Sequence, residues 1–377
     1  MKFIVSSAIL QKQLSAIQGV IASNPTLPIL ENLLLSLDKS TLTATASDLN
    51  VFMTTQVSVE SSDTGSIAVP AKIFLDTLKN LPEQPVTIEA NQENFSVEIT
   101  AYSGKYQITG APAGDYPRLP ETKAAQNIDV DCSLLKKALS NTLFAVGADE
   151  LRPAMTGLFF KVSADAANFV ATDSHRLIRY TRTDVQMEEE NLTNGLIVPK
   201  KALSILKGVL PEEGVMMQLN FSSSHAFFSF QQIRMIARLI DENFPDYVNA
   251  IPQNNTNELT IDRAEFLNAL KRVAIFTNKT THQIRLKLTT TQLEVLAEDV
   301  DFGNRASERL ACDYQGEEME IGFNVQFLIE MLSNLLTKEV VFSFSTPNRA
   351  GLLRPKQDNA QEDILMLVMP VMLNTYA

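Results

Sequence analysis

The strongest constraint on the fold is a sequence unit that occurs three times at almost even spacing. The copies are AVPAKIFLDTLKNL from Ala68, IVPKKALSILKGVL from Ile197 and IGFNVQFLIEMLSNLL from Ile321. Each copy has the pattern of an apolar strand end followed by an amphipathic helix. The copies lie about 125 residues apart, a common size for one domain. The 377-residue chain is therefore predicted to contain three similar domains.

A second helix is predicted near the start of each third, because apolar residues recur there at helical spacing. These residues are Leu10, Leu14, Ile17 and Ile21, then Leu135, Leu139 and Val146, then Phe266, Leu270 and Val273. Two strand-like runs follow each of these helices, and the second run of each pair ends in an acidic residue: Asp48, Asp173 or Asp299. The prediction is an α+β fold in which each domain packs two helices on antiparallel sheets. Polar joints that contain proline place the domains at residues 1–124, 125–256 and 257–377.

The central copy of the repeat predicts a helix whose first turn contains Pro199, since proline is tolerated there. Leu203, Leu206 and Leu210 then form one apolar stripe. Lys200 and Lys207 lie together on another face, with Lys201 beside them. Such a face is most simply a solvated basic surface.

The distribution of charge gives these lysines a second interpretation. The chain has a formal net charge of −12. The six predicted helical segments, residues 7–21, 71–81, 133–147, 200–210, 263–277 and 324–337, together carry +8, which leaves −20 for the rest. A protein with cationic helices and acidic sheets could face phosphates with the helices and repel them elsewhere.

Several classes of site are not indicated by the sequence. Cys132 and Cys312 are isolated, and the three histidines lack the spacing of a metal site. No nucleotide-binding motif is present, so no cofactor is predicted. Asp299 and Asp301 could bind a cation weakly, although a structural role at a strand end is favoured. The longest apolar run, 364–373, is about half of a membrane span, and no leader is seen, so a cytoplasmic protein without membrane contact is predicted.

An enzyme is not predicted, although Asp173, Ser174 and His175 are adjacent in the sequence. Consecutive strand residues point to opposite faces, so Ser174 and His175 could not easily act as nucleophile and base. No GxSxG motif is present. The hydrolase alternative would require turnover that depends on His175, and we assign no catalytic residues.

Strings along the whole chain resemble the bacterial DNA polymerase III β subunits, the sliding clamps. They are MKF at the start, NPTLPILENLLL (24–35), TGLFF (156–160), VATDSHRL (170–177), IVPKKAL (197–203), NFPDY (243–247), MEIGFN (319–324) and VMPVML (368–373). The resemblance implies a processivity factor that acts as a head-to-tail homodimer, a six-domain ring around double-stranded DNA of any sequence. The implied partners are a clamp-loader ATPase, and polymerase subunits and repair proteins that bind through short linear peptides. Catalytic chemistry and cofactors are not implied.

The resemblance further implies a peptide-binding cleft, which corresponds to Met155, Thr172, Ser174, His175, Arg176, Leu177, Pro245, Asn249, Val368, Met369, Pro370, Val371 and Met372. Methionines suit such a cleft because they can repack around different peptides. Ser174 stands where glycine is usual in the family, and Asn249 and Met372 stand where arginines are usual. Residues 374–377 extend past the usual end.

Positions that approach DNA in the family correspond to Asn24, Lys72, Arg152, Lys200 and Lys201, and an arginine is common at the first of them. The resemblance places the dimer contact between Tyr106 and Ile108 of one subunit and Ile275 and Phe276 of the other. An edge strand is suited to such a contact. The principal alternative is a three-repeat scaffold that binds only proteins.

Overall fold

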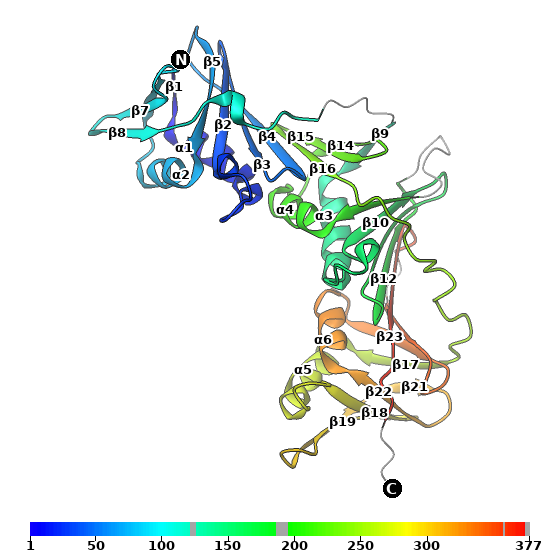
Figure 1. Cartoon of the computed structure of the whole chain (residues 1–377). Coiled ribbons are helices and arrows are strands. Elements are labelled where there is room, and N and C mark those ends of the chain that lie inside the picture. The colour runs from blue at the N-terminus through cyan, green and yellow to red at the C-terminus, as the bar shows by residue number, and fades with distance from the viewer. Residues whose placement is uncertain (121–125, 186–194, 357–358, 374–377) are drawn as a thin grey trace. The chain divides into compact units, whose positions relative to one another are not determined.

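The computed structural model describes residues 1–120, 126–185, 195–356 and 359–373, and the four terminal residues of the predicted extension lie outside these ranges. The chain divides into two compact units (Figure 1). Unit 1 contains residues 1–136 and 201–239, and unit 2 contains residues 137–200 and 240–377.

The helices lie where the repeat predicts them, two in each third. The described residues contain α1 (Ser7–Ile17), α2 (Ala71–Asn80), α3 (Cys132–Thr142), α4 (Lys200–Val209), α5 (Arg263–Val273) and α6 (Val325–Ser333). The first helix of each third continues into one 3-10 turn: η1 (Gln18–Val20), η4 (Leu143–Ala145) or η6 (Ala274–Phe276). The predicted apolar stripes are buried except at Ile21, where Val20 is the buried residue. Further 3-10 turns are η2 (Pro28–Glu31), η3 (Ala113–Asp115) and η5 (Pro153–Met155).

The predicted position of Pro199 in the first helical turn is wrong by one residue. Pro199 ends strand β13 (Leu196–Pro199) opposite Gly157, and α4 begins at Lys200. Pro70 likewise ends β5 (Thr64–Pro70) just before α2. Both strands lie at the edge of their sheets, where a residue without an N–H breaks no ladder.

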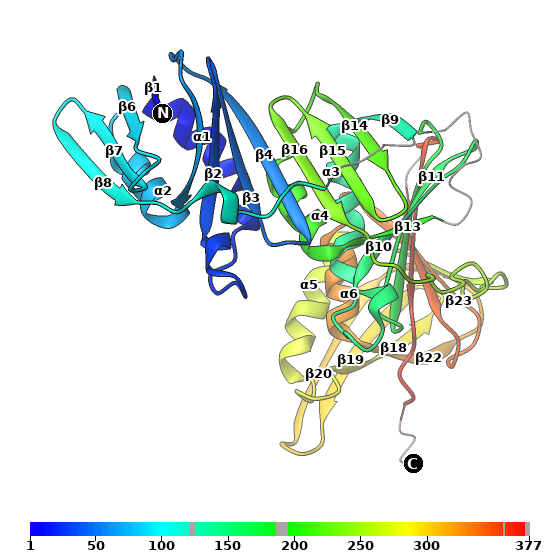
Figure 2. The same cartoon turned by 45° about the horizontal axis from the view of Figure 1, so that its top comes forward.

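Unit 1 contains two antiparallel sheets. The smaller has the order β1 (Lys2–Ser6), β6 (Pro85–Ala90), β7 (Ser96–Ala101), β8 (Gly104–Thr109). The larger has the order β5, β2 (Asn32–Asp38), β3 (Thr41–Ser47), β4 (Val51–Ser58), β16 (Ile233–Arg238), β15 (His225–Phe230), β14 (Met216–Phe221), β9 (Gln126–Asp131). Helices α1 and α2 lie side by side against β2 to β5, as both views of the ribbon show (Figures 1 and 2).

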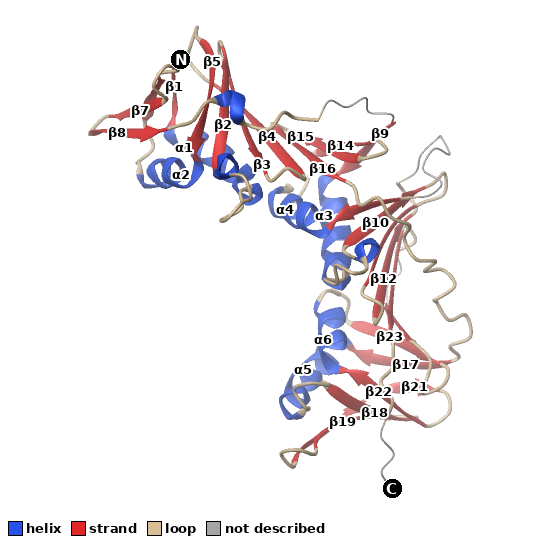
Figure 3. Ribbon diagram, in the orientation of Figure 1, coloured by secondary structure: helices blue, strands red, loops and turns tan. Residues whose placement is uncertain are grey.

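Unit 2 repeats this plan. Its larger sheet has the order β13, β10 (Gly157–Val162), β11 (Ala167–Thr172), β12 (Arg176–Arg182), β25 (Glu362–Val368), β24 (Gly351–Pro355), β23 (Glu339–Phe344), β17 (Asn257–Asp262), β21 (Asp313–Gln315). Its smaller sheet has the order β20 (Asn304–Ala311), β19 (Gln292–Asp299), β18 (Gln283–Thr289), β22 (Met319–Asn324). Helices α5 and α6 pack on each other and on these strands (Figure 3).

The central third shares its strands between the two large sheets. Strand β16 pairs with β4 of the first third, from Ile233 opposite Thr55 to Ala237 opposite Val51. Strand β12 pairs with β25 of the last third, from Arg176 opposite Val368 to Arg182 opposite Glu362. The predicted α+β class with helices on antiparallel sheets is confirmed, and backbone hydrogen bonds continue each large sheet from one repeat into the next.

The three strand-end acids organise the turns that follow them. An oxygen of Asp48 accepts from the amides of Asn50 (3.0 Å) and Val51 (2.7 Å). Asp173 accepts in the same way from two amides, and Asp299 accepts from the amide of Asp301 at 3.3 Å. This pattern is an Asx-turn, in which the side chain replaces a backbone acceptor. The geometry supports the structural role over the cation site considered for Asp299 and Asp301.

Strand β25 also carries a buried carboxylate that holds it to its surroundings. The Glu362 side chain is 1% exposed, and it binds Lys137 Nζ of α3 at 2.6 Å. Arg182 Nη1 lies 3.6 Å from the same carboxylate, and Asn359 Nδ2 donates to it at 3.3 Å. The carboxylate is therefore paired and hydrogen-bonded, as a buried charge must be.

Replacing Ser174 by glycine should stabilise unit 2. Ser174 has φ +77°, in the left-handed region that costs a residue with a Cβ about 1 kcal/mol. Ser174→Gly is expected to raise the free energy of unfolding by up to about 1 kcal/mol, and Ser174→Val should lower it by at least as much. Urea unfolding of both variants measures this. Equal stability of the glycine and valine variants would contradict it.

Neutralising Glu362 should destabilise unit 2 far more than neutralising its neighbour. Glu362→Gln is expected to lower the free energy of unfolding by about 2 kcal/mol, because hydrogen bonds to a charged group are lost in a buried place. Asp363→Asn is the matched control. Asp363 pairs with Arg179 at 2.7 Å but is 48% exposed, so about 0.5 kcal/mol or less is expected. The two free energies are compared by urea unfolding, and similar values would contradict the role given to Glu362.

Candidate functional site

The turn between β11 and β12 is held by its own side chains. Asp173 Oδ1 accepts from the amides of His175 and Arg176, both at 3.0 Å. Thr172 Oγ1 donates to the carbonyl of Arg176 at 2.7 Å. Ser174 and His175 are exposed at the tip. The turn therefore presents two polar residues on a backbone that has little freedom to move.

The assignment of Ser174 and His175 to a strand is corrected by this geometry. Both residues lie in the turn, and each has a different partner. Ser174 Oγ donates to Met155 Sδ at 3.3 Å and also accepts from Arg152, whereas the His175 ring stacks on Phe327 with 6.0 Å between centroids. The two side chains are not joined as a nucleophile and a base would be.

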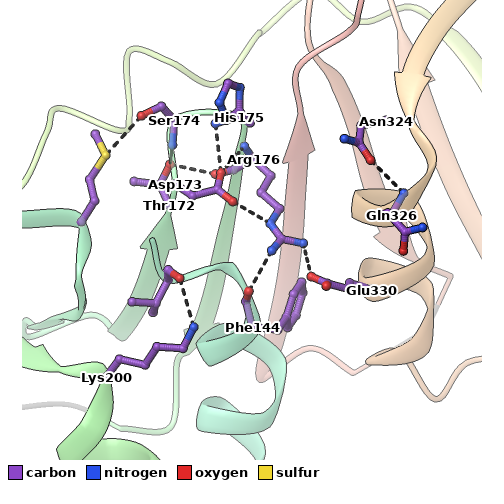
Figure 4. A network of polar contacts seen from close by, with 12 residues as sticks. Phe144, Thr172, Asp173, Ser174, His175, Arg176, Lys200, Asn324, Gln326 and Glu330 are labelled. Carbon is purple, nitrogen blue, oxygen red and sulfur yellow. Dashed lines mark hydrogen bonds and ion pairs between the residues drawn. The ribbon is translucent and has the colours of Figure 1, made fainter. Parts of the chain in front are cut away.

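Arg176 lies beneath the turn with its charge already compensated (Figure 4). Its Nε donates to Asp173 at 3.0 Å, its Nη1 to Glu330 at 2.5 Å and its Nη2 to the carbonyl of Phe144 at 2.9 Å. The guanidinium also lies over two rings, 5.4 Å from the centroid of Phe144 and 4.7 Å from that of Phe327. Arg176 is 7% exposed. It therefore ties the central third to α6 of the last third, and has little capacity left to bind a partner.

The chain after β25 runs from this turn toward β22. The amide of Met369 donates to the carbonyl of His175 at 2.8 Å, and the amide of Val371 donates to that of Gly322 at 2.8 Å. A Cβ at position 322 would lie 2.5 Å from the Val371 oxygen, so the close approach requires glycine. Strand β25 ends at Val368, and Pro370 lies outside it, where its missing N–H breaks no ladder. Met369 and Met372 are exposed.

The loop of residues 240–252 packs on Phe159 of β10. The Phe244 ring stacks on Phe159 at 4.7 Å, and Tyr247 contacts Phe159 edge-on at 6.1 Å. Burial raises the pKa of the Tyr247 phenol. Asn249 is exposed but tied down, because its Nδ2 donates to Asp246 at 2.6 Å. Phe244 and Tyr247, which flank Pro245 in this loop, pack against an apolar cluster of Phe159, Val170, Leu177, Ile197, Ile251, Ala350, Leu352, Leu365 and Leu367.

All the predicted cleft residues belong to unit 2. Direct contacts join Met155 to Ser174 and His175 to Met369, and Leu177 lies in the apolar cluster below them. Phe144, Phe327 and Glu330 were not predicted. Phe327 lies off the buried stripe of α6, which is Val325, Leu328, Met331 and Leu332. An aromatic residue on the polar face of a helix is the signal that could have identified it.

The predicted DNA-binding residues differ in whether their side chains already bind other groups of the protein. Asn24 and Lys72 are exposed. Lys201 Nζ binds the carboxylate of Asp48, and Lys200 Nζ donates to the carbonyl of Val146 at 3.2 Å. Arg152 pairs with Asp149 at 2.9 Å and contacts Ser174, which places it beside the predicted cleft. The amide of Leu151 and the Arg152 guanidinium lower the pKa of Asp149.

One of the predicted dimer residues is buried within its own unit. Ile108 of β8 is 6% exposed, so its side chain belongs to the core of unit 1. Tyr106 on the same edge strand is 39% exposed and lines a 590 Å³ groove with Ile73 and Leu81 of the α2 region. Ile275 and Phe276 of η6 are exposed in unit 2. Of the two predicted residues on this strand, Tyr106 therefore presents its side chain to a partner, whereas Ile108 presents mainly its backbone.

Metal-binding clusters and membrane-spanning helices can be sought in the part of the chain that the structure describes. No group of three or more potential metal ligands occurs among those residues. None of the helices described is both long enough and apolar enough to cross a membrane.

Comparisons with known proteins match the chain from end to end. Residues 1–120, 129–246 and 248–371 match the N-terminal, central and C-terminal domain families of the DNA polymerase III beta subunit. The beta sliding clamp of Synechococcus elongatus is 30% identical over 384 residues, covering 100% of both chains. That of Pseudomonas putida is 29% identical over 374 residues, covering 99% of this chain and 100% of the relative.

Solved structures of sliding clamps are also similar to this chain over nearly its whole length. The DNA polymerase sliding clamp from Pseudomonas aeruginosa, crystallised with a ligand, has a TM-score of 0.93 and 28% identity, covering 99% of this chain and 100% of that one. A Pseudomonas aeruginosa clamp bound to griselimycin has a TM-score of 0.92 at 28% identity, with the same shares covered. The chain therefore belongs to the DNA polymerase III beta subunit family, the sliding clamps.

Proposed function

We propose that this protein is a DNA polymerase processivity clamp that encircles double-stranded DNA as a head-to-tail homodimer. The observation that carries the proposal is the end-to-end match of all three domains to beta sliding clamps. The three clamp domains have boundaries near residues 124 and 256. A ring holds DNA by topology, so the contacts to phosphate can stay weak enough for sliding, and they carry no base sequence.

Closure of the ring uses two edge strands. Strand β8 ends the small sheet of unit 1, and β20 ends the small sheet of unit 2. An unpaired edge is ready to bind a strand of another chain. The groove beside Tyr106 in one subunit can receive Ile275 or Phe276 of its partner, which are exposed in the single chain. One end of each subunit then binds the other end of its partner, and two subunits close the ring.

Partner proteins bind as short peptides on the surface around His175. Met155, His175, Met369 and Met372 supply apolar and adaptable side chains there, above a rigid base formed by Arg176. An extended peptide with leucine or phenylalanine side chains would gain roughly 25 cal/mol for each Å² of apolar area covered. Griselimycin binding by the Pseudomonas aeruginosa relative agrees with a ligand site on this kind of protein. Polymerase subunits, repair proteins and a clamp-loading ATPase are the partners expected for a replication clamp in the cytoplasm.

Topology should govern how long the protein stays on DNA. After loading by a clamp-loader ATPase, the protein is expected to remain on nicked circular DNA in high salt. Over the same interval it should slide off DNA that has been cut into a linear form. Retention is measured by gel filtration of labelled protein. Phe276→Asp should prevent closure and abolish retention, whereas Leu336→Asp, at a site 92% exposed elsewhere in unit 2, should not. Equal salt-driven loss from circular and linear DNA would contradict the ring.

The methionines near the C-terminus should contribute to peptide affinity. Replacing Met369 and Met372 together by alanine is expected to weaken a labelled peptide that carries leucine and phenylalanine by about tenfold, because apolar contact area is lost. Fluorescence polarisation measures the affinity. Met216→Ala removes a methionine of unit 1 whose exposure, 58%, lies between the 43% of Met369 and the 79% of Met372, and it should change nothing. Unchanged affinity of the double variant would refute the assignment of this surface.

A further inference from the structure

An ion pair in unit 1 joins a candidate DNA-binding lysine to a strand-end acid. Lys201 lies in the first turn of α4, and its Nζ binds Oδ2 of Asp48, 153 residues away in the chain. The Lys201 side chain is 55% exposed, whereas that of Asp48 is 10% exposed. The cation therefore stays accessible to solvent, while the carboxylate that binds it is almost covered.

Asp48 is held in place by a second set of bonds. Its Oδ1 accepts from the amides of Asn50 and Val51, at 3.0 and 2.7 Å. These bonds fix the carboxylate, so Oδ2 has a defined position from which to bind the ammonium. A fixed anion loses little freedom when it binds a cation, and it is therefore an effective acceptor.

Other cations of the repeated helices are paired in the same way. Lys136 binds Glu212 at 2.6 Å, and Lys137 binds Glu362 at 2.6 Å. Arg272 binds Glu308 at 2.5 Å. In each case the carboxylate comes from outside the helical segments, so the charge of +8 on those segments is partly neutralised within the protein.

We propose that Asp48 is a built-in competitor of DNA phosphate for Lys201. This inference rests on the proposed function, since it requires DNA to pass the N-terminal end of α4. A phosphate that binds Lys201 must share or take the ammonium from Asp48, so the contact yields little net affinity. Asp48 thereby acts as a positioning residue that weakens the grip on the DNA backbone and favours sliding.

The test uses the full-length protein and a short fluorescein-labelled duplex, with binding followed by anisotropy over a range of salt concentrations. Asp48→Asn preserves an oxygen for the Asn50 and Val51 amides but removes the charge. The affinity at low salt is expected to rise roughly two- to fivefold, the worth of an exposed ion pair. The plot of log affinity against log salt should steepen by about 0.9, the value for one further phosphate contact.

A double-substitution cycle separates competition from a change in folding. Lys201→Ala alone should change the affinity by less than about twofold, because the lysine is already paired. The same substitution should cancel the whole gain in the Asp48→Asn background. Should Asp48→Asn fail to fold, the single Lys201→Ala result still decides, since loss of a full phosphate contact would overturn the competitor role.

Glu89→Gln is the control for net charge. Glu89 of β6 forms an exposed pair with Lys2 of β1 in the same unit, at 3.3 Å, and both residues lie outside the six helical segments. Its substitution adds the same charge but should leave the salt slope unchanged. Equal slopes for Asp48→Asn and Glu89→Gln would overturn the inference while leaving the clamp function intact. If the unsubstituted protein neither binds the duplex nor stays on circular DNA, the proposed function fails, and the inference fails with it.

Discussion

Antiparallel pairing between strands of different repeats is the interaction on which the rest of the structure depends. A domain of this kind would expose β4 or β12 as an unpaired edge, with a row of free N–H and C=O groups. Pairing of β4 with β16 and of β12 with β25 removes those edges and joins neighbouring repeats through backbone hydrogen bonds. The three repeats are thus joined by two continuous sheets, one in unit 1 and one in unit 2.

The same pairing assembles the candidate peptide site. Because Arg176 is opposite Val368 in the β12–β25 ladder, the turn before β12 and the chain after β25 leave the sheet at the same place. Met369 is then bonded to His175 across that place. Arg176 adds a second connection through Glu330 of α6. A shift of one residue in the ladder would move every side chain of β25 to the other face and separate these groups.

The electrostatics of the chain are set by pairing as well as by composition. The six helical segments carry a surplus of positive charge in the sequence. In the structure, several of those cations bind carboxylates from strands and loops, including Lys137 with Glu362 and Lys201 with Asp48. A clamp that holds DNA by topology has no need of strong phosphate contacts, and compensated cations would suit sliding. The sign of the helical charge follows from the sequence, whereas its effective strength does not.

Short-range features were determined by the sequence alone. The strand-like run predicted to end at Asp48 is β3, which ends one residue earlier at Ser47. The helices follow their apolar stripes, because periodicity over a few turns reports one buried face. The acid at the end of a strand, such as Asp173, could also be placed. The resemblance supplied the cleft residues, and the structure brings several of them into contact.

Long-range partners were decided only by the tertiary structure. Nothing in the local pattern states that β12 pairs with β25, that Ile108 is covered by its own unit, or that Lys201 binds Asp48. Pro199 ends a strand because that strand lies at a sheet edge, which is a property of the whole sheet. Pairing and burial arise when segments far apart in the chain meet, and the spacing of residues within one segment carries no record of that meeting.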